Sequence, residues 1–425
     1  MKNILLVSPT VWDQEELAEE RLAGAYRMTV LRDGNFHWPR TFGLGQALRR
    51  FDVFRAIDAA LEQCRGMKIH GVVGTDEFLA CAIAAVLARR MDLPGPAPAA
   101  MLRAMHKYYS RLAQREAVPE ATAGFTLINP LDLSEEPRGV SFPMFVKPVR
   151  GTYSVLAQRM DSMEALRRFL SFSLIQRAVG RSIMRPFNQL LARYTDAEYD
   201  ANFFIGEQIL EGSLVTVEGY VQTGDVSLLG VVDASMYPGT NSFARFDYPS
   251  RHPAGVLRRM GEIAARVVKG LSLDHCLFNV EMFWRHETDS IHVLEVNPRM
   301  AYQFADLYEK VDGINSYDVQ LALATGDRPP AASGFGRFRA AASFVMRRFE
   351  DARILSLPGA PEIATVKARF PGVRVRLYGR RGARLSEQKG CESYRYAIVN
   401  LGGADREELD NLFIEAGRHL TFNFG

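Results

Sequence analysis

Two hydrophobic stretches that lie close together in the chain each carry carboxylate residues, and they constrain the fold more than any other feature. The first, Phe278–Trp284, contains Glu281, and the second, Ile291–Arg299, contains Glu295 and Asn297. Alternate residues of a strand point to opposite faces, so Glu295 and Asn297 are expected on one face. Two neighbouring strands with carboxylates facing one cleft suit a hard cation such as Mg²⁺. The alternative is a pair of half-exposed strands whose acids face solvent.

The overall composition narrows the class of protein. Of the 425 residues, 47% are hydrophobic and 24% charged, which is ordinary for a soluble enzyme of roughly two to four domains. The 52 basic and 49 acidic residues nearly balance, which argues against nucleic acid as a main partner. No run approaches the ~18 apolar residues of a membrane-spanning helix, so no membrane span is expected. Four widely separated cysteines and a start without a signal peptide indicate a cytoplasmic protein.

The N-terminal part alternates between expected strands and expected helices. This alternation predicts a small parallel sheet, an α/β layer. The strands are expected at 4–8, 26–31 and 71–74, and the helices at 13–22, 45–64 and 75–90. No glycine fingerprint follows the first strand, which argues against a nicotinamide dinucleotide site. Asp76 and Glu77 fall in the first turn of the third helix, where we interpret them as complements to the helix dipole rather than as substrate contacts.

Two linkers divide the chain. The segment Leu93–Pro98 is rich in proline and glycine, which stop one helix and delay the next. A second linker is expected at Thr325–Pro330. Beyond it the pattern indicates strand, loop, strand and then a helix at 405–420, typical of a small α+β domain. The expected domains are 1–94, 95–330 and 331–425.

The middle part contains a candidate phosphate-binding turn. A strand expected at 141–148 carries Lys147, and the small residues Gly151, Thr152 and Ser154 follow it. Backbone N–H groups and hydroxyls in such a turn can close over phosphates. Many hairpins contain these residue types, and the lysine four residues before the glycine makes the signal more specific.

A basic amphipathic helix is expected at about 171–193. Arg177, Arg181 and Arg185 recur every four residues beside a row of apolar side chains. Three interpretations compete: a solvated helix face, a lid over an anionic substrate, or a surface for a membrane or partner. The pattern favours the first.

Five motifs occur in a fixed order along the chain. They are Lys107 on a helix, Phe145–Pro148 with Gly151 and Ser154, Glu207–Gly212, Val280–Met282 and Glu295–Arg299. In this order they resemble the ATP-grasp superfamily, and most of all its biotin-carboxylase-like carboxylate–amine ligases, which include the L-amino acid ligases. The resemblance covers nearly the whole chain. It implies a mixed α/β and α+β fold: an N-terminal Rossmann-like (preATP-grasp) domain, an ATP-grasp domain with a lid subdomain at about 140–205, and a small C-terminal α+β domain.

The resemblance implies a set of nucleotide contacts. Lys107 and Lys147 would meet the phosphates of ATP as point charges. The turn with Gly151, Thr152 and Ser154 would close over the triphosphate and exclude water. A hinge made of Glu207, Gln208, Ile209 and Leu210 would lie beside adenine. Backbone groups of Gln208 and Leu210 would read the base edge, and Ile209 would pack near the ring.

The resemblance also implies metal ligands and a catalytic residue. Glu281, Glu295 and Asn297 would hold one or two Mg²⁺ ions, or Mn²⁺, that bridge the phosphates. Arg299 would stabilise the transferred phosphoryl group and the acyl-phosphate carbonyl, a task that its planar guanidinium suits.

The chain departs from its relatives at two places. Relatives commonly carry an acidic ribose contact two places after the hinge glycine, where this chain has Leu214. Glu218, the next acid along the strand, is the expected substitute. Relatives also have glycines after the arginine, whereas Met300–Phe304 is bulkier, so a preference for small amino acids is not carried over.

The expected function is an ATP- and Mg²⁺-dependent ligase. A substrate carboxylate would take the γ-phosphoryl group, and an amine would then displace phosphate to form an amide, leaving ADP. The alternatives are the same phosphate chemistry on bicarbonate or a thiol acceptor, and a non-catalytic ATP-binding module that regulates a partner. The expected partners are a small carboxylate and an amine, and the resemblance allows a homodimer.

Overall fold

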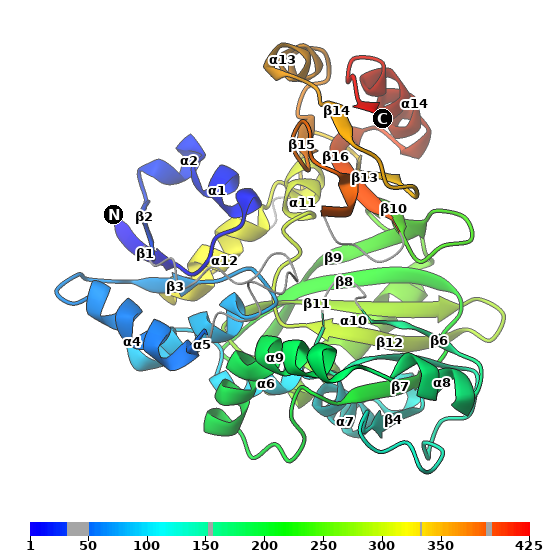
Figure 1. The fold of residues 1–425 in the computed structure, drawn as a ribbon. Helices are drawn as coiled ribbons and strands as arrows, with labels where there is room; N and C mark the ends of the chain where they lie inside the picture. The colour runs from blue at the N-terminus through cyan, green and yellow to red at the C-terminus, as the bar shows by residue number, and fades with distance from the viewer. Residues whose placement is uncertain (32–50, 152–155, 332–333, 388–392) are drawn as a thin grey trace.

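The N-terminal part forms the expected α/β layer. The computed structural model describes residues 1–31, 51–151, 156–331, 334–387 and 393–425 (Figure 1). Three parallel strands lie in the order β2-β1-β3, with helices packed around them. The strands are β1 (Lys2–Leu6), β2 (Tyr26–Val30) and β3 (Gly71–Val73), and the helices are α1 (Val11–Leu17), α2 (Glu20–Ala23), α4 (Val53–Gln63) and α5 (Ala80–Arg90). Among the residues so described, no helix is long and apolar enough to cross a membrane.

The helix boundaries differ from the expected ones. The acidic helix expected at 13–22 is two helices, and the first begins at Val11 because Thr10 and Asp13 form a capping box. Residues 45–50 of the second expected helix lie outside the described residues, and α4 begins after Asp52, whose side chain caps it. The third expected helix begins at Ala80 rather than at Thr75, so the segment before it is a turn.

A four-stranded antiparallel sheet lies in the region where the lid is expected, and its role as a lid stays a prediction. Its order is β4-β7-β5-β6, and its core contains Met144, Val146 and Leu166. The elements are β4 (Phe125–Ile128), β5 (Met144–Pro148), β6 (Gln158–Met160), β7 (Phe204–Gln208) and α8 (Met163–Phe169); α6 (Pro98–Met105), α7 (Lys107–Ala117) and the turn η2 (Pro119–Ala121) precede them. The basic helix α9 (Leu174–Tyr194) does not share this core. Its Phe187 and Leu190 pack with α4, α5 and α6, so it joins the lid to the N-terminal layer.

A large antiparallel sheet forms the centre of the molecule. Its eight strands lie in the order β12-β11-β8-β9-β10-β13-β16-β15 (Figure 1). They are β8 (Ser213–Gln222), β9 (Asp225–Met236), β10 (Phe243–Tyr248), β11 (Cys276–Arg285), β12 (Ser290–Asn297), β13 (Ala340–Arg348), β15 (Arg374–Leu377) and β16 (Tyr394–Gly403). Val217 and Val280 are paired and face α10 (Ala254–Gly270), so Thr216 and Glu281, also paired, face the other side.

The ladder continues across the expected boundary at residue 330. β10 pairs with β13 from Arg245↔Phe344 to Tyr248↔Ala341, so the C-terminal strands extend the central sheet. The remaining elements flank it. They are α11 (Ala305–Asp312), α12 (Ser316–Thr325), β14 (Ile354–Ser356), α13 (Ala360–Arg369), the turn η3 (Leu385–Glu387), α14 (Arg406–Gly417) and β17 (Asn423–Phe424).

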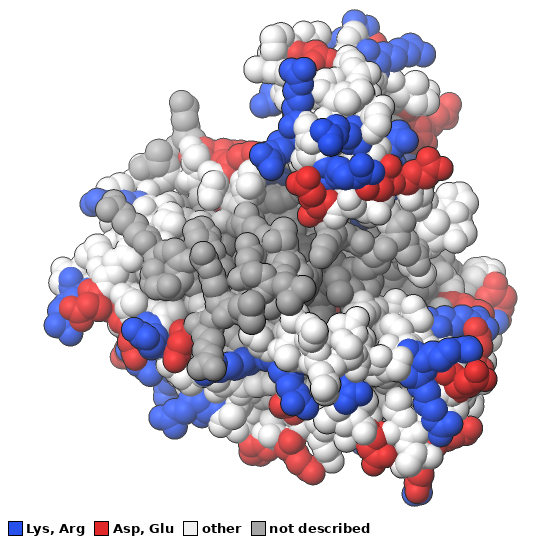
Figure 2. Space-filling model, in the orientation of Figure 1, with Lys and Arg blue, Asp and Glu red and all other residues white. Residues whose placement is uncertain are grey.

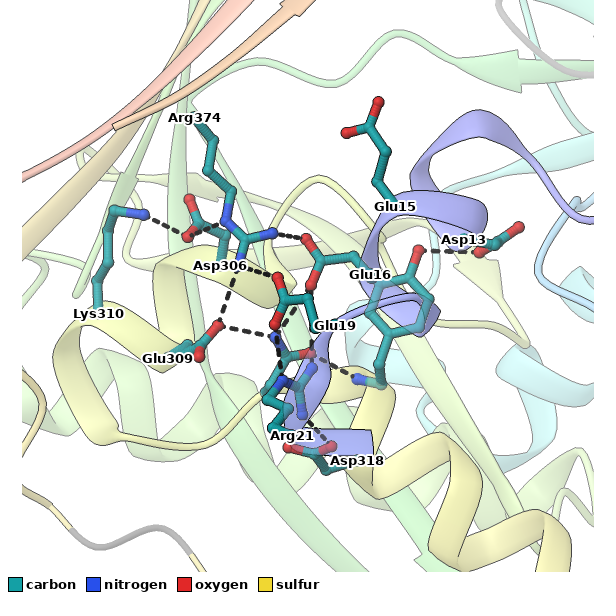
Figure 3. Close-up of polar contacts among 12 residues, drawn as sticks. Asp13, Glu15, Glu16, Glu19, Arg21, Asp306, Glu309, Lys310, Asp318 and Arg374 are labelled. Atoms are coloured by element: carbon teal, nitrogen blue, oxygen red, sulfur yellow. Dashed lines mark hydrogen bonds and ion pairs between the residues drawn. The ribbon is translucent and has the colours of Figure 1, made fainter. Parts of the chain in front are cut away.

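One arginine joins the C-terminal strands to the N-terminal layer. The guanidinium of Arg374 on β15 pairs with Glu16 on α1, with Glu19 at 3.0 Å, with Asp306 at 2.9 Å and with Glu309 at 3.5 Å (Figure 3). These acids come from α1, the turn before α2, and α11. Removing one partner from a buried ionic cluster is strongly destabilising, so this contact fixes the C-terminal segment against α1 and α11.

Candidate active site

The structure brings the acids of β11 and β12 together. Glu281 lies opposite Glu295 in the ladder, and Asn279 lies opposite Asn297. Asn297 Nδ2 is 3.4 Å from Glu281 Oε1 and 3.4 Å from Asn279 Oδ1. Among the described residues, no three His, Cys, Asp or Glu side chains gather to hold a metal. The candidate ligand set is therefore two carboxylates and an amide, and its metal-binding role stays a prediction.

The two carboxylates affect each other, and Lys107 contacts one of them. Burial and the repulsion from Glu295 raise the pKa of Glu281 to about 7. Lys107, the first residue of α7, places Nζ 2.7 Å from Glu295 Oε1 and 3.0 Å from the carbonyl oxygen of Gly151. Lys107 therefore joins the acid pair to the start of the candidate phosphate turn. Thr152 and Ser154 of that turn lie outside the described residues.

The second lysine belongs to a buried ionic cluster. Lys147 Nζ on β5 is 2.7 Å from Glu207 Oε2 on β7, and Arg111 Nε on α7 is 2.7 Å from Glu207 Oε1. Burial alone would raise the pKa of Glu207, but Arg111 and Lys147 lower it to about 2. Arg111 also donates to the carbonyl oxygens of Val293 and Leu294 on β12, at 2.5 and 2.8 Å. The Glu207 side chain thus holds Lys147 in place.

The expected adenine hinge follows the end of β7. The N–H of Gln208 donates to the carbonyl of Gly124 at 2.9 Å, so the predicted adenine contact of Gln208 falls to its carbonyl group. Ile209 and Leu210 follow as half-buried residues in the connection to β8. Their predicted contacts with the base stay predictions.

Glu77 is a site residue that the sequence interpretation missed. It lies in the turn before α5, so its assignment to a first helical turn was wrong. Its Oε2 accepts from Arg299 Nη2 at 2.7 Å and Nε at 3.2 Å, and its Oε1 accepts from Arg150 Nη1 at 3.3 Å. Burial opposes the charge of Glu77, but Arg299, Arg150 and Lys107 lower its pKa to about 2. Its place just after a parallel strand, where ligands of α/β sheets commonly bind, was the available signal.

Arg150, which follows β5, connects the turn before α5 to the smaller sheet. Its side chain is 1% exposed and donates to the carbonyl of Phe78 at 2.8 Å. It stacks on the rings of Phe78 and Phe187, 5.4 and 5.3 Å from the centroids. Arg150 immediately precedes Gly151, so the N-terminal layer and α9 together fix the start of the candidate phosphate turn.

Glu218 hydrogen-bonds to groups of the protein itself. Its side chain is fully buried, accepts the N–H of Ala301 at 2.8 Å and is 3.2 Å from the hydroxyl of Tyr308. Burial raises its pKa to about 8. Glu218 therefore supports the loop after Arg299, and its expected contact with ribose stays a prediction. In that loop Tyr302 packs against Trp12 with ring centroids 5.4 Å apart.

Comparison with solved structures identifies the fold. Neither a protein family model nor a curated protein matches the sequence. The chain is similar to L-amino acid ligase from Bacillus licheniformis, with 18% identity, a TM-score of 0.72, and coverage of 100% of this chain and 99% of that one. It is also similar to phosphoribosylglycinamide synthetase from Anaerococcus prevotii (12%, TM-score 0.66, 100% and 100%) and to N5-carboxyaminoimidazole ribonucleotide synthetase from Thermotoga maritima (15%, 0.65, 99% and 99%). The predicted ATP-grasp fold is confirmed.

Proposed function

We propose that this protein is an ATP- and Mg²⁺-dependent carboxylate–amine ligase that forms an amide through an acyl phosphate and releases ADP and phosphate. The observation that carries the proposal is the paired Glu281 and Glu295, with Lys107 on one of them and Arg299 on the segment that follows. The similarity to enzymes described as ligases and synthetases supports the same reaction class.

The residues present fit a divalent cation and a triphosphate. Two carboxylates and the amide oxygen of Asn297 are hard ligands of the kind that Mg²⁺ prefers. A cation between Glu281 and Glu295 would relieve the repulsion that raises the pKa of Glu281. When bound, it would neutralise phosphate oxygens during phosphoryl transfer. Lys107 and Lys147 supply positive charge for the phosphates, each held by a carboxylate.

The remaining side chains orient the substrate. Glu77 binds two nitrogens of Arg299, while Arg299 Nη1 donates to the carbonyl of Met300 at 3.3 Å. A guanidinium held in this way presents fixed positive charge to a carboxylate or to the acyl phosphate. Such chemistry depends on positioning and electrostatics and needs no protein nucleophile.

The test measures ADP release from Mg-ATP with a panel of carboxylic acids and amines. We expect at least one acid–amine pair to support turnover, and Glu295→Gln to abolish ADP formation while circular dichroism shows an intact fold. Glu287→Gln, an exposed acid in the turn between β11 and β12, is the matched control and should stay active.

The possible results separate the alternatives. Tight Mg-ATP binding without turnover of any acid would favour the regulatory module. Turnover without an amine, dependent on bicarbonate or a thiol, would favour the other acceptors. Unchanged turnover in Glu295→Gln would contradict the metal assignment.

A further inference from the structure

The basic helix α9 has an unusual charge composition. Its 21 residues include four arginines and neither aspartate nor glutamate. Arg177, Arg181 and Arg185 are spaced four residues apart, so their like charges repel along one face. On the preceding helix, α8, an acidic residue offsets the basic charge: Arg168 pairs with Glu164 at 3.0 Å. On α9 this repulsion has no acidic neighbour within the helix to offset it.

Arg181 and Arg185 line a groove on the surface of α9. The groove has a volume of about 610 Å³, and among the described residues that line it none is acidic. The other lining residues are Ser182, Asn188, Gln189, Ala192 and Asn202. Neither arginine makes an ion pair within the described part of the chain. Gln189 has a buried side-chain oxygen without a hydrogen-bond partner there, and turning its amide over would present the N–H₂ group at the same place.

The amide groups of the groove are fixed by Asp200. Asn188 Nδ2 and Asn202 Nδ2 both donate to Asp200 Oδ2, at 3.2 and 2.8 Å, and the N–H of Asn202 donates to Oδ1 at 2.9 Å. Three donors therefore satisfy the Asp200 carboxylate. His106 Nε2 lies 3.3 Å from the carbonyl oxygen of Asp200, and Lys107 is the next residue. The groove is thus linked through Asp200 to the segment that carries Lys107, but it contains no residue of the candidate ATP site.

We propose that this groove binds a phosphate-bearing small anion, with Arg181 and Arg185 as its cationic ligands. Two guanidinium groups one helical turn apart match the several oxygens of a phosphate or diphosphate. Amides beside them suit further polar atoms of a small molecule. Figure 2 shows basic and acidic side chains over one face of the molecule, with several basic ones gathered on the C-terminal lobe. The same chemistry occurs in a lipid headgroup, and Leu174 and Ile175 are exposed at the start of α9, but the amide side chains beside the two arginines favour the free anion.

The experiment titrates inorganic pyrophosphate into the full chain by isothermal calorimetry at constant ionic strength. Saturating Mg²⁺ and a non-hydrolysable ATP analogue are present, so that the candidate ATP site is occupied. We expect saturable binding that the double variant Arg181→Gln/Arg185→Gln weakens about tenfold or more, since each arginine contributes charge-assisted hydrogen bonds. The matched control is Arg193→Gln, an exposed arginine of the same helix outside the groove, which should bind as the wild type does.

Each result of this experiment either supports or overturns the proposed anion site. Absence of saturable binding, an unchanged affinity in the double variant, or an equal loss in Arg193→Gln would overturn the proposal. The proposal would also be overturned if the protein does not bind pyrophosphate but sediments with phosphatidylserine vesicles in a way that requires Arg181 and Arg185. If the double variant does not fold, the single variants replace it, each with an expected loss of about threefold or more. The proposal is independent of ligase activity, because the readout is binding.

Discussion

Glu281 is the residue whose surroundings most directly constrain its chemistry. It is half-buried on the sheet and faces a second carboxylate, so its ionised form is disfavoured and its pKa is raised to about 7. A metal ligand must lose its proton before it binds. If Glu281 is a metal ligand as proposed, its protonation state would set the metal affinity of the site in the neutral pH range.

We predict that Mg²⁺ binds more tightly as the pH rises through 7. Below its pKa, Glu281 is protonated and competes with the metal, so the apparent affinity should fall by up to about tenfold per pH unit. The check is the Mg²⁺ dependence of ADP release between pH 6 and pH 8. Glu281→Gln should weaken Mg²⁺ activation and remove this pH dependence. A Mg²⁺ requirement in the wild type that does not vary with pH would contradict the prediction.

Some residues of the site were predictable and others were not. The pair of acids was predictable, because the two-residue period of strands and a short hairpin place Glu281 beside Glu295. The contacts of Glu77 and Glu218 were not predictable, for one physical reason. Their surroundings come from Arg299, Ala301 and other segments far away in the chain, and local patterns carry no information about such contacts.

At the scale of elements, α7 is the connection between the two antiparallel sheets. Arg111 contacts Glu207 on β7 of the smaller sheet and two carbonyls on β12 of the larger one. Glu207 also holds Lys147, so one carboxylate balances two buried cations. The helix and strands were predictable from their patterns, and the ionic cluster that joins them was not.

We predict that Glu207→Gln destabilises the fold by about 3 kcal/mol or more, because it leaves Arg111 and Lys147 buried without a counter-charge. Thermal unfolding followed by circular dichroism measures the change. Glu164→Gln, which removes an exposed ion pair on α8, should change the stability by less than about 1 kcal/mol.

The pH dependence of stability provides a second check on the same carboxylate. The pKa of Glu207 is lowered in the folded state, so its contribution is present above the unfolded value near 4.5 and is lost as the pH falls towards 2. The difference in stability between wild type and Glu207→Gln should therefore shrink between about pH 5 and pH 2. A constant difference would contradict this assignment.

The whole molecule is organised by a sheet that crosses an expected domain boundary. Proline and glycine at Thr325–Pro330 correctly indicate a break between elements, but such a signal does not say which strands pair afterwards. β13 returns to lie beside β10, and Arg374 on β15 then contacts α1 and α11. The order of layers could be expected from the sequence, whereas this long-range pairing could not.

We predict that a chain ending at residue 330 does not fold into a soluble protein. It lacks β13, β15 and β16, so β10 becomes an uncovered edge and the acids around Arg374 lose their partner. Soluble yield and circular dichroism measure the outcome. A chain ending at residue 421 loses β17 and the ring contacts of Phe422 and Phe424 with Tyr396, but it keeps every strand of the central sheet and should remain folded. A folded, soluble 1–330 fragment would contradict the prediction.

The role of Arg111 has a consequence for how fast a nucleotide leaves. If the smaller sheet acts as the predicted lid, opening the site would move it away from the larger sheet. That movement would separate β7 from β12, and the guanidinium between them would have to release its bonds to one side first. Arg111 would then act as a latch whose strength sets the dwell time of a bound nucleotide, a kinetic property carried by a side chain outside the chemistry itself.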